Sequence, residues 1–259
     1  MKKQTLLLLF VGILFVGFTT SCSKKSNEGP KQEDNNGDGD GDDNGNTNVT
    51  AYLQGSNYYL LSMDSETEAK ISSKVVKDYR PNDSNLFLYV WENTYSAGTP
   101  SGPNSFGAVA PWTSLVVAAP AGWSGFGISP DVDGHPGGAQ LDLSGVGNDY
   151  VLHLAMKSKD NATHVVALWD ASGTDYRVAI GPAAFNDAGA GRITPAYTDF
   201  TRDGEWHHIE IPISEFTKQG LIYRPGNPIT TGNVFSMLSG GVAGKTLDID
   251  GVFIYKPKK

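Results

Sequence analysis

The carboxylates of the chain are the first residues to test for chemistry, because glycoside hydrolysis needs two carboxyl groups held roughly 5 to 9 Å apart across a cleft. Glu205, Glu210 and Glu215 lie five residues apart in EWHHIEIPISEF, so successive ones alternate faces of a strand. The pair Asp248 and Asp250 shares a face in LDID. The strand motif E-x-D-x-x-E does not occur in the chain. One face-sharing pair is weak support for a catalytic site.

Other catalytic motifs are incomplete. A serine nucleophile elbow reads G-x-S-x-G, but around Ser124 the chain reads GWSGF, with Phe126 in place of the last glycine. None of the histidines belongs to an H-E-x-x-H zinc motif. His208 and Glu210 can share a strand face, but two ligands do not make a metal site, and we expect the adjacent pair His207 and His208 at the surface. The sequence therefore predicts that the protein is not an enzyme.

Aromatic side chains offer a different chemistry. In the run LFLYVW (86–91), aliphatic and aromatic residues alternate. A strand sends alternate side chains to opposite faces, so one face carries Phe87, Tyr89 and Trp91. We expect the aliphatic face in the core. Two interpretations of the aromatic face stay open: other segments cover the rings, or the rings are exposed for a ligand to stack on.

A sugar ring suits such a face, because its apolar C–H groups stack on indole or phenol rings while polar neighbours bond its hydroxyls. The candidate rings are those of the aromatic row, those near glycine and proline loops, and one at a strand end. We predict as ligand-binding residues Tyr89, Trp91, Tyr95, Trp112 and Trp169. Trp123 and Trp206 are expected to be structural.

The first 21 residues have the layout of an export signal. Lys2 and Lys3 precede an apolar stretch from 6 to 18, and small residues follow before Cys22. The apolar stretch is shorter than the roughly 20 residues that a spanning helix needs. The segment TTSC resembles the bacterial lipobox, although a leucine is more usual at its first position. We therefore predict a signal peptide over 1–21 and lipidation of Cys22, which anchors the protein to a membrane.

Residues 22–49 are predicted to form a disordered acidic tether, because they are nearly free of apolar side chains. Their alternating aspartates do not complete an EF-hand loop: frames that start at Asp34 or Asn36 lack the glutamate at the twelfth position. Cys22 is the only cysteine, so the exported chain has no internal disulfide. The net charge of −8 and the lack of a basic patch make nucleic acid a poor partner.

Residues 50–259 are predicted to form one all-β domain. Short strand-like runs such as 150–156 and 207–213 alternate with Gly, Pro, Asn and Asp clusters, and no long segment has a 3.6-residue period. This pattern favours a two-sheet β-sandwich of jelly-roll type. The sandwich is expected to bury the aliphatic face of each strand between its sheets and to leave the opposite face to solvent or a ligand.

Several segments together resemble the galactose-binding-like jelly-roll carbohydrate-binding modules of surface lipoproteins in Bacteroidetes polysaccharide-utilisation systems. The likeness covers about 120–259 well and 58–119 loosely. The segments that carry it are GWSGFGI (122–128), LDLSGVGNDYVLHLAMKS (141–158), GEWHHIEIPISEF (204–216) and LDIDGVFIY (247–255).

This resemblance implies a non-catalytic protein of the outer membrane, exposed at the cell surface, that holds a polysaccharide or oligosaccharide near partner transporters and hydrolases. It also implies a structural calcium ion at Asp250, with Asp64 or Glu66 as the early ligand; no other cofactor is expected. Two alternatives stay open. One is a glycoside hydrolase or polysaccharide lyase of jelly-roll type, and the other is a structural or adhesion protein of the envelope with buried rings.

Overall fold

The computed structural model describes residues 49–82, 84–118, 122–130 and 138–258. The predicted signal peptide, Cys22, the tether up to residue 48 and His135 lie outside these residues. The described strands are β1 (Ser56–Ser62), β2 (Val75–Asp78), β3 (Phe87–Val90), β4 (Tyr95–Ala97), β5 (Thr113–Val117), β6 (Gly122–Ser129), β7 (Val151–Lys157), β8 (His164–Trp169), β9 (Asp175–Ile180), β10 (Phe185–Asp187), β11 (Arg192–Thr194), β12 (Ala196–Thr198), β13 (His207–Pro212), β14 (Phe235–Gly241) and β15 (Thr246–Lys256).

The helical elements are all short. They are the 3₁₀ turns η1 (Val49–Leu53), η2 (Ser72–Lys74) and η3 (Trp91–Asn93) and the helices α1 (Ser65–Ala69) and α2 (Ser214–Thr217). Nowhere in the described ranges is there a helix long and apolar enough to cross a membrane.

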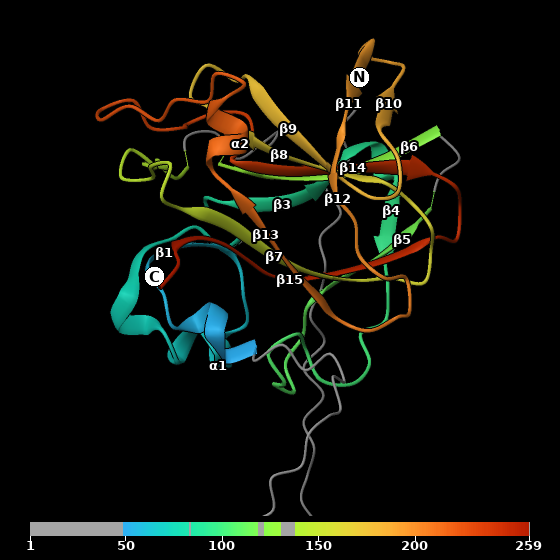
Figure 1. Cartoon of the computed structure of the whole chain (residues 1–259), viewed down its shortest axis with the longest axis horizontal. Coiled ribbons are helices and arrows are strands. Elements are labelled where there is room, and N and C mark those ends of the chain that lie inside the picture. The colour runs from blue at the N-terminus through green and yellow to red at the C-terminus, as the bar shows by residue number, and fades with distance from the viewer. Residues whose placement is uncertain (1–48, 83, 119–121, 131–137, 259) are drawn as a thin grey trace, which may run out of the picture. The chain divides into compact units, whose positions relative to one another are not determined.

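Within the described residues, the strands form two sheets and a small hairpin. Sheet A has seven strands in the order β13-β7-β15-β1-β2, with β5 pairing with β15 and β4 with β5. Sheet B has six strands in the order β12-β9-β8-β14-β6-β3, and β10 pairs with β11. In Figure 1, β8, β9 and β14 lie in the upper part, β7 and β15 lie beneath them, and α1 is lowest. The chain is therefore an all-β, two-sheet sandwich of jelly-roll type, as predicted.

The main core lies between the two sheets, and strand alternation selects the residues that enter it. Leu152, Leu154 and Met156 of β7 are fully buried in one cluster with the inward side chains of sheet B. Leu88 and Val90 of β3 pack against the same cluster, as the alternation in LFLYVW predicts. Burial of such aliphatic side chains stabilises the fold by about 1.5–3 kcal/mol each.

The outer face of sheet A is also covered, and here the expectation of an open outer face is wrong. His153 and Ala155 point away from the main core, yet both are fully buried. A second hydrophobic cluster lies over this face, built from η1, the chain around α1, strands β1 and β15, and Phe106. Alternation along β7 cannot reveal this cover, because the covering segments are remote in sequence.

His208 is half-buried under the ring of Tyr52 rather than open at the surface, which corrects the expectation for the adjacent histidine pair. The ring of Tyr52, in η1, stacks on His208 with centroids 4.7 Å apart and an interplanar angle of 12°. Nε2 of His153 lies 3.0 Å from Nδ1 of His208, and Nδ1 of His153 lies 2.7 Å from the carbonyl oxygen of Gly251. Burial lowers the pKa of His153 to about 3 and that of His208 to about 4. His207 remains partly exposed beside Asp203.

A third histidine, His164, lies inside the sandwich at one end. Its Nδ1 contacts Oγ of Ser239, and its Nε2 is buried with no hydrogen-bond partner. The residue lines a cavity of about 70 Å³ together with Tyr95, Asp160 and Lys245, among others. Burial, assisted by the charge of Arg202, lowers the pKa of His164 to about 3. The imidazole is therefore neutral at physiological pH.

We predict that acid destabilises the domain through its buried histidines. An unfolded histidine binds a proton near its ordinary pKa of 6.5, whereas folded His164 does so only near 3. Between these values the unfolded state holds more protons, so the free energy of unfolding should fall as the pH drops below 6.5. Denaturant unfolding from about pH 7.5 to pH 4 measures this slope. His164→Asn, which cannot titrate, should flatten it, and an equal slope in the variant would contradict the assignment.

Candidate functional site

Four aromatic rings lie on the outer face of sheet B, and we call them the aromatic platform: Tyr89, Trp91, Trp123 and Trp169. All four are half-buried. The ring of Trp91 lies 6.3 Å from that of Tyr89, edge-on at 69°, and 6.5 Å from that of Trp123, tilted by 51°. Phe87, the first residue of the row, is buried. The structure therefore brings together three of the predicted ligand-binding residues and adds Trp123.

The indole of Trp91 lies directly over the backbone of β6. A Cβ atom at Gly125 would lie 2.6 Å from Cε3 of Trp91, and one at Gly127 would lie 3.2 Å from its Cζ2. Real Cβ atoms do not approach as closely as the first of these distances, so the ring can rest there only because residue 125 is glycine. At Gly127 the nearest atom to such a Cβ is Oδ1 of Asn233. One face of the indole is thus covered by the sheet.

Trp123 belongs to the same group, although the sequence led us to expect a structural role. It precedes Gly125 and Gly127 by two and four residues and therefore shares their outward face. The alternation in GWSGFG was the signal that could have found it: two glycines in line with a tryptophan leave a shallow floor for a ring from the neighbouring strand. Cross-strand pairs confirm the arrangement, since Tyr89 of β3 lies opposite Gly127.

Trp169 lies at the other side of the platform, at the end of β8. Its Nε1 donates a hydrogen bond of 2.8 Å to Oγ of Ser236 in β14, and Ser236 in turn lies opposite Gly127. The turn that follows is fixed by Asp170, whose Oδ1 accepts from the backbone N–H groups of Ser172 and Thr174 at 2.9 and 3.1 Å. Burial raises the pKa of Asp170, but the hydrogen bonds outweigh it and the pKa lies below its usual range.

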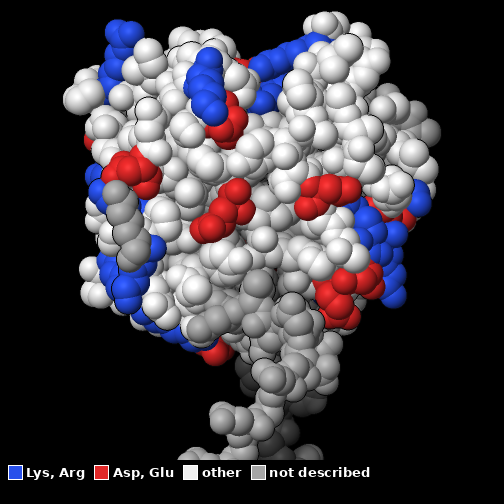
Figure 2. Space-filling model, viewed as in Figure 1, with Lys and Arg blue, Asp and Glu red and all other residues white. Residues whose placement is uncertain are grey.

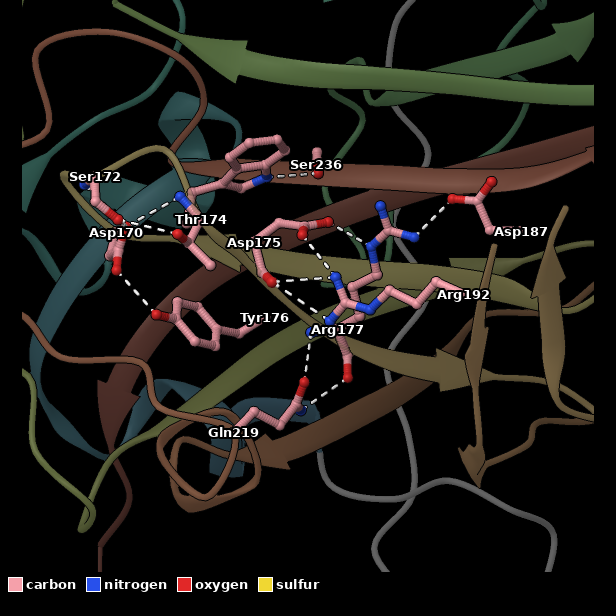
Figure 3. Close-up of polar contacts among 11 residues, drawn as sticks. Asp170, Ser172, Thr174, Asp175, Tyr176, Arg177, Asp187, Arg192, Gln219 and Ser236 are labelled. Atoms are coloured by element: carbon pink, nitrogen blue, oxygen red, sulfur yellow. Dashed lines mark hydrogen bonds and ion pairs between the residues drawn. The ribbon is translucent and has the colours of Figure 1, made fainter. Parts of the chain in front are cut away.

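Ion pairs adjoin Trp169 on β9 and attach the hairpin of β10 and β11 to sheet B. Figure 3 shows Asp175 between Arg177 and Arg192, with Asp187 beyond Arg177. Asp175 contacts Nε of Arg177 and accepts from Nη1 of Arg192 at 2.7 Å, and Asp187 accepts from Nη1 of Arg177 at 2.7 Å. Gln219 bonds both the backbone N–H and the carbonyl of Arg177. The ion pairs therefore attach the hairpin to β9, the strand that pairs with the one carrying Trp169.

Tyr95 does not lie on the platform. It begins β4, which belongs to sheet A, and its side chain is only 2 % exposed. The ring points across the core and meets Phe126 edge-on at 6.5 Å. A ligand on the surface of sheet B cannot stack on it. Burial raises the pKa of its phenol.

Trp112 lies on the outer side of sheet A, away from the platform, because β5 pairs with β15. It meets Trp206 edge-on at 5.4 Å, and Nζ of Lys157 lies 4.7 and 4.9 Å from the two ring centroids. Lys157 is also 3.5 Å from Asp248. The protein's own ammonium group therefore occupies the corner between these rings, as a cation–π partner does.

The two carboxylates named for calcium come close to the same loop. Asp250 accepts from the backbone N–H and the hydroxyl of Ser105 at 3.1 and 2.6 Å. Asp64 caps α1 through Thr67 and accepts from the amide of Asn104 at 2.7 Å. Burial and the charge of Asp64 raise the pKa of Asp250. Within the described ranges no group of three or more His, Cys, Asp or Glu side chains forms a metal cluster. Calcium at this site stays a prediction.

Charges on the visible surface are dispersed. Figure 2 shows Asp and Glu in small separate groups, with Lys and Arg mostly near the rim of this view. Large uncharged areas lie between them. A nucleic acid requires a continuous basic surface for its phosphates, and this face does not offer one.

Comparisons with known proteins find distant structural likenesses only. No family model matches the chain, and no curated protein matches it. A family 30 carbohydrate-binding module is 15 % identical, over 66 % of this chain and 78 % of that one, with a TM-score of 0.39. A family 11 module from Clostridium thermocellum, in complex with a β-1,3-1,4-mixed-linked tetrasaccharide, is 16 % identical over 68 % and 91 %, with a TM-score of 0.34.

An exo-β-agarase is 13 % identical over 71 % of this chain but only 24 % of its own length, with a TM-score of 0.41. The chain therefore spans about a quarter of that enzyme. At these scores the likenesses assign no function to the chain. Its function must be argued from its own residues.

We predict that Gly125→Ala dislodges Trp91. The added methyl group would meet the indole at 2.6 Å and Leu238 at 2.9 Å, so one of them must move. Such overpacking should lower the free energy of unfolding by about 1–3 kcal/mol, and quenching of tryptophan fluorescence by acrylamide should increase. Gly240→Ala is the matched control, because it lies on the neighbouring strand β14 with no atom within 4 Å of its added Cβ. Equal quenching in both variants would contradict the contact.

Proposed function

We propose that this domain is a non-catalytic glycan-binding domain of a lipid-anchored surface protein. The observation that carries the proposal is the half-buried indole of Trp91, which lies over Gly125 of β6 with the rings of Tyr89 and Trp123 beside it. A half-buried ring that is held in place by the sheet suits the apolar C–H face of a sugar. Binding by stacking on such a ring requires no catalytic group.

Polar groups near the rings supply partners for sugar hydroxyls. Ser236 lies between Trp169 and Gly127. The exposed residues Glu92 and Asn93 follow Trp91 directly in the turn η3. Aromatic surface with a small number of placed polar groups is the usual composition of a carbohydrate or small-molecule site.

The tilt between the rings favours a single glycan chain over a crystalline surface. Tyr89 and Trp123 are inclined to Trp91 by 69° and 51°. A flat crystalline polysaccharide would require coplanar rings to contact several sugars at once. A soluble chain can turn from one sugar to the next and follow rings that differ in tilt.

The charge around the platform favours a neutral glycan. Arg177 and Arg192 are each paired with aspartate, and Asp175 and Asp187 are engaged in return. An acidic sugar would have to displace these carboxylates to reach the guanidinium groups. The net charge of −8 adds to the repulsion of a polyanion.

Three of the acids considered for hydrolysis are engaged elsewhere. Glu210 accepts from the hydroxyl of Tyr255, Glu215 pairs with Lys218, and Asp250 is buried against Ser105. Glu210 and Asp250 lie on the outer side of sheet A, away from the platform. A binder that does not cleave its ligand fits this distribution better than a glycosidase, which needs two carboxyl groups across one cleft.

The N-terminal end of the described domain and the aromatic platform lie on different sheets, which suits a binding domain that is anchored through its N-terminal tether. The described chain begins at η1, which packs on the outer face of sheet A through Tyr52. The platform is on sheet B and faces the other way. With lipid on Cys22 and residues 22–49 as a tether, the protein would hold polysaccharide at the outer membrane near transporters and hydrolases.

We predict that Trp91→Ala and Trp169→Ala each weaken glycan binding about tenfold or more, equal to about 1.4 kcal/mol. The reason is the loss of one stacking surface in each case. Affinity gel electrophoresis of the purified domain against a panel of neutral soluble polysaccharides identifies a ligand, and calorimetry then compares the variants. Trp112→Ala serves as the comparison on the other face of the sandwich and should bind as the unmodified domain does.

The same panel tests the competing enzymatic function. Each polysaccharide is incubated with the unmodified domain, and new reducing ends and unsaturated products are measured over time. Steady product release would reject the non-catalytic proposal. Absence of any binding across the panel, with tryptophan fluorescence unchanged, would favour a structural or adhesion protein instead.

We also predict that Cys22→Ser abolishes lipid attachment. In a bacterial host that processes lipoproteins, labelled palmitate should be incorporated into the full chain and not into the variant, because the thiol is the site of the lipid. The variant should leave the membrane fraction. Equal labelling of both proteins would refute the anchor.

A further inference from the structure

We propose that Thr94 is a positioning residue, which fixes the Trp91 indole on β6 and so pre-forms the stacking surface for one sugar ring. This inference rests on the proposed function of the platform. Thr94 is fully buried and lies three residues after Trp91, at the end of the turn η3 and directly before β4. It touches no solvent, so its role can act only through its neighbours.

The hydroxyl of Thr94 joins the two segments that meet under the indole. It donates a hydrogen bond of 2.8 Å to the carbonyl oxygen of Trp91. It also accepts a hydrogen bond of 3.0 Å from the backbone N–H of Gly125, the glycine that the indole covers. One oxygen atom therefore connects the backbone of the stacking residue to the strand on which its side chain rests.

The backbone of Thr94 adds two more restraints. Its N–H donates to the carbonyl of Trp91 at 3.0 Å, which closes the turn. Its own carbonyl accepts from the N–H of Ala118 at 2.9 Å, which ties the turn to the end of β5. The turn is thus fixed to both sheets, because β6 belongs to sheet B and β5 to sheet A.

The turn is held in a conformation that the chain would not adopt freely. Glu92 and Asn93 have φ values of 50° and 54°, so two successive non-glycine residues lie in the left-handed region. Such strain persists only where surrounding contacts fix it, and it gathers at sites of function. The Thr94 contacts supply that restraint. The strained turn redirects the chain at Trp91, so that its indole lies across β6 rather than continuing along β3.

Fixing the Trp91 indole raises the affinity for a ligand, because the free protein already holds the ring in its bound orientation. A side chain that must be ordered by its ligand loses conformational entropy at that step, and the affinity falls accordingly. Thr94→Val preserves the shape of the side chain but removes every hydrogen bond of the hydroxyl. Thr94→Ser keeps the hydroxyl and removes only a methyl group.

The test uses the full chain labelled with 5-fluorotryptophan, which gives one fluorine signal for each of the five tryptophans. Trp91→Phe assigns the signal of Trp91 by its loss. In Thr94→Val this signal should broaden or split while those of Trp112 and Trp206 stay unchanged, and affinity for the glycan found above should fall about tenfold. Thr94→Ser should restore both the signal and the affinity. Failure of Thr94→Ser to restore them would show that the methyl group, not the hydroxyl, matters.

Two controls separate positioning from general loss of stability. Thr67→Val removes another fully buried threonine hydroxyl, one with no hydrogen-bond partner, and should change neither readout. If Thr94→Val does not fold, Glu92→Val disfavours the turn from an exposed position, because a β-branched residue is strained at positive φ, and Glu92→Asn removes the same carboxylate with a residue that tolerates positive φ. Only the valine variant should broaden the Trp91 signal.

The outcomes also separate this inference from the proposed function. An unchanged Trp91 signal and unchanged affinity in Thr94→Val, together with weak binding in Trp91→Ala, would reject the role of Thr94 and leave the glycan site intact. If the unmodified protein binds no glycan, the proposed function fails, and the fluorine signals alone then decide whether Thr94 fixes the ring.

Discussion

Sheet A is covered on both of its faces, whereas sheet B packs one face on sheet A and carries half-buried rings on the other, and this asymmetry decides where a ligand can lie. In β7 both the inward Leu152 and the outward His153 are fully buried. In β8 the outward Val165 and Ala167 are buried beneath neighbours, but Trp169 at the strand end is not. The second hydrophobic cluster stabilises the fold and covers the outer face of sheet A, so the proposed glycan site is placed on sheet B.

The outward glycines of β6, Gly125 and Gly127, lower the stability of the strand but leave room for the indole of Trp91. Glycine in a strand interior lowers strand stability, because it has no side chain to pack and loses more entropy on folding. At Gly125 the indole of Trp91, in the turn that follows β3, restores the missing contact, and at Gly127 the side chain of Asn233 also contributes. The sheet thus regains packing from a ring that stays half-buried. A larger residue at Gly125 would stabilise the isolated strand but displace the ring.

Local alternation could be predicted from the sequence, but pairing between remote strands could not. The run LFLYVW correctly places Leu88 and Val90 inward and Tyr89 and Trp91 outward, because the strand period is two. Trp112 lies close to this run in sequence, yet its strand joins sheet A by pairing with β15, more than a hundred residues later. No local pattern encodes that choice.

Tyr95 and His153 show two further limits of the sequence. Tyr95 follows Trp91 by four residues, but the strained turn at Glu92 and Asn93 carries the chain from sheet B to sheet A and turns its ring into the core. Positive φ at non-glycine residues has no reliable signature in composition. His153 alternates as an outward residue should, and it is buried because η1 and the chain around Phe106 cover it. Alternation identifies the face and says nothing of what lies over it.

The contacts that support the aromatic platform come from separate elements, and they hold its rings in place before any ligand binds. Thr94 holds Trp91 to β6, Ser236 of β14 holds Trp169, and the ion pairs of Arg177 hold the hairpin beside them. Trp91 and Trp169 are therefore fixed by different elements, and their relative placement depends on the order of the sheet between them. The proposed non-catalytic binding depends on this order, because a protein whose rings already hold the bound orientation loses little conformational entropy when the ligand binds. The same argument explains why the charged groups near Trp169 are paired with each other: a guanidinium that already has its carboxylate stays in place, whether or not a neutral sugar lies on the rings.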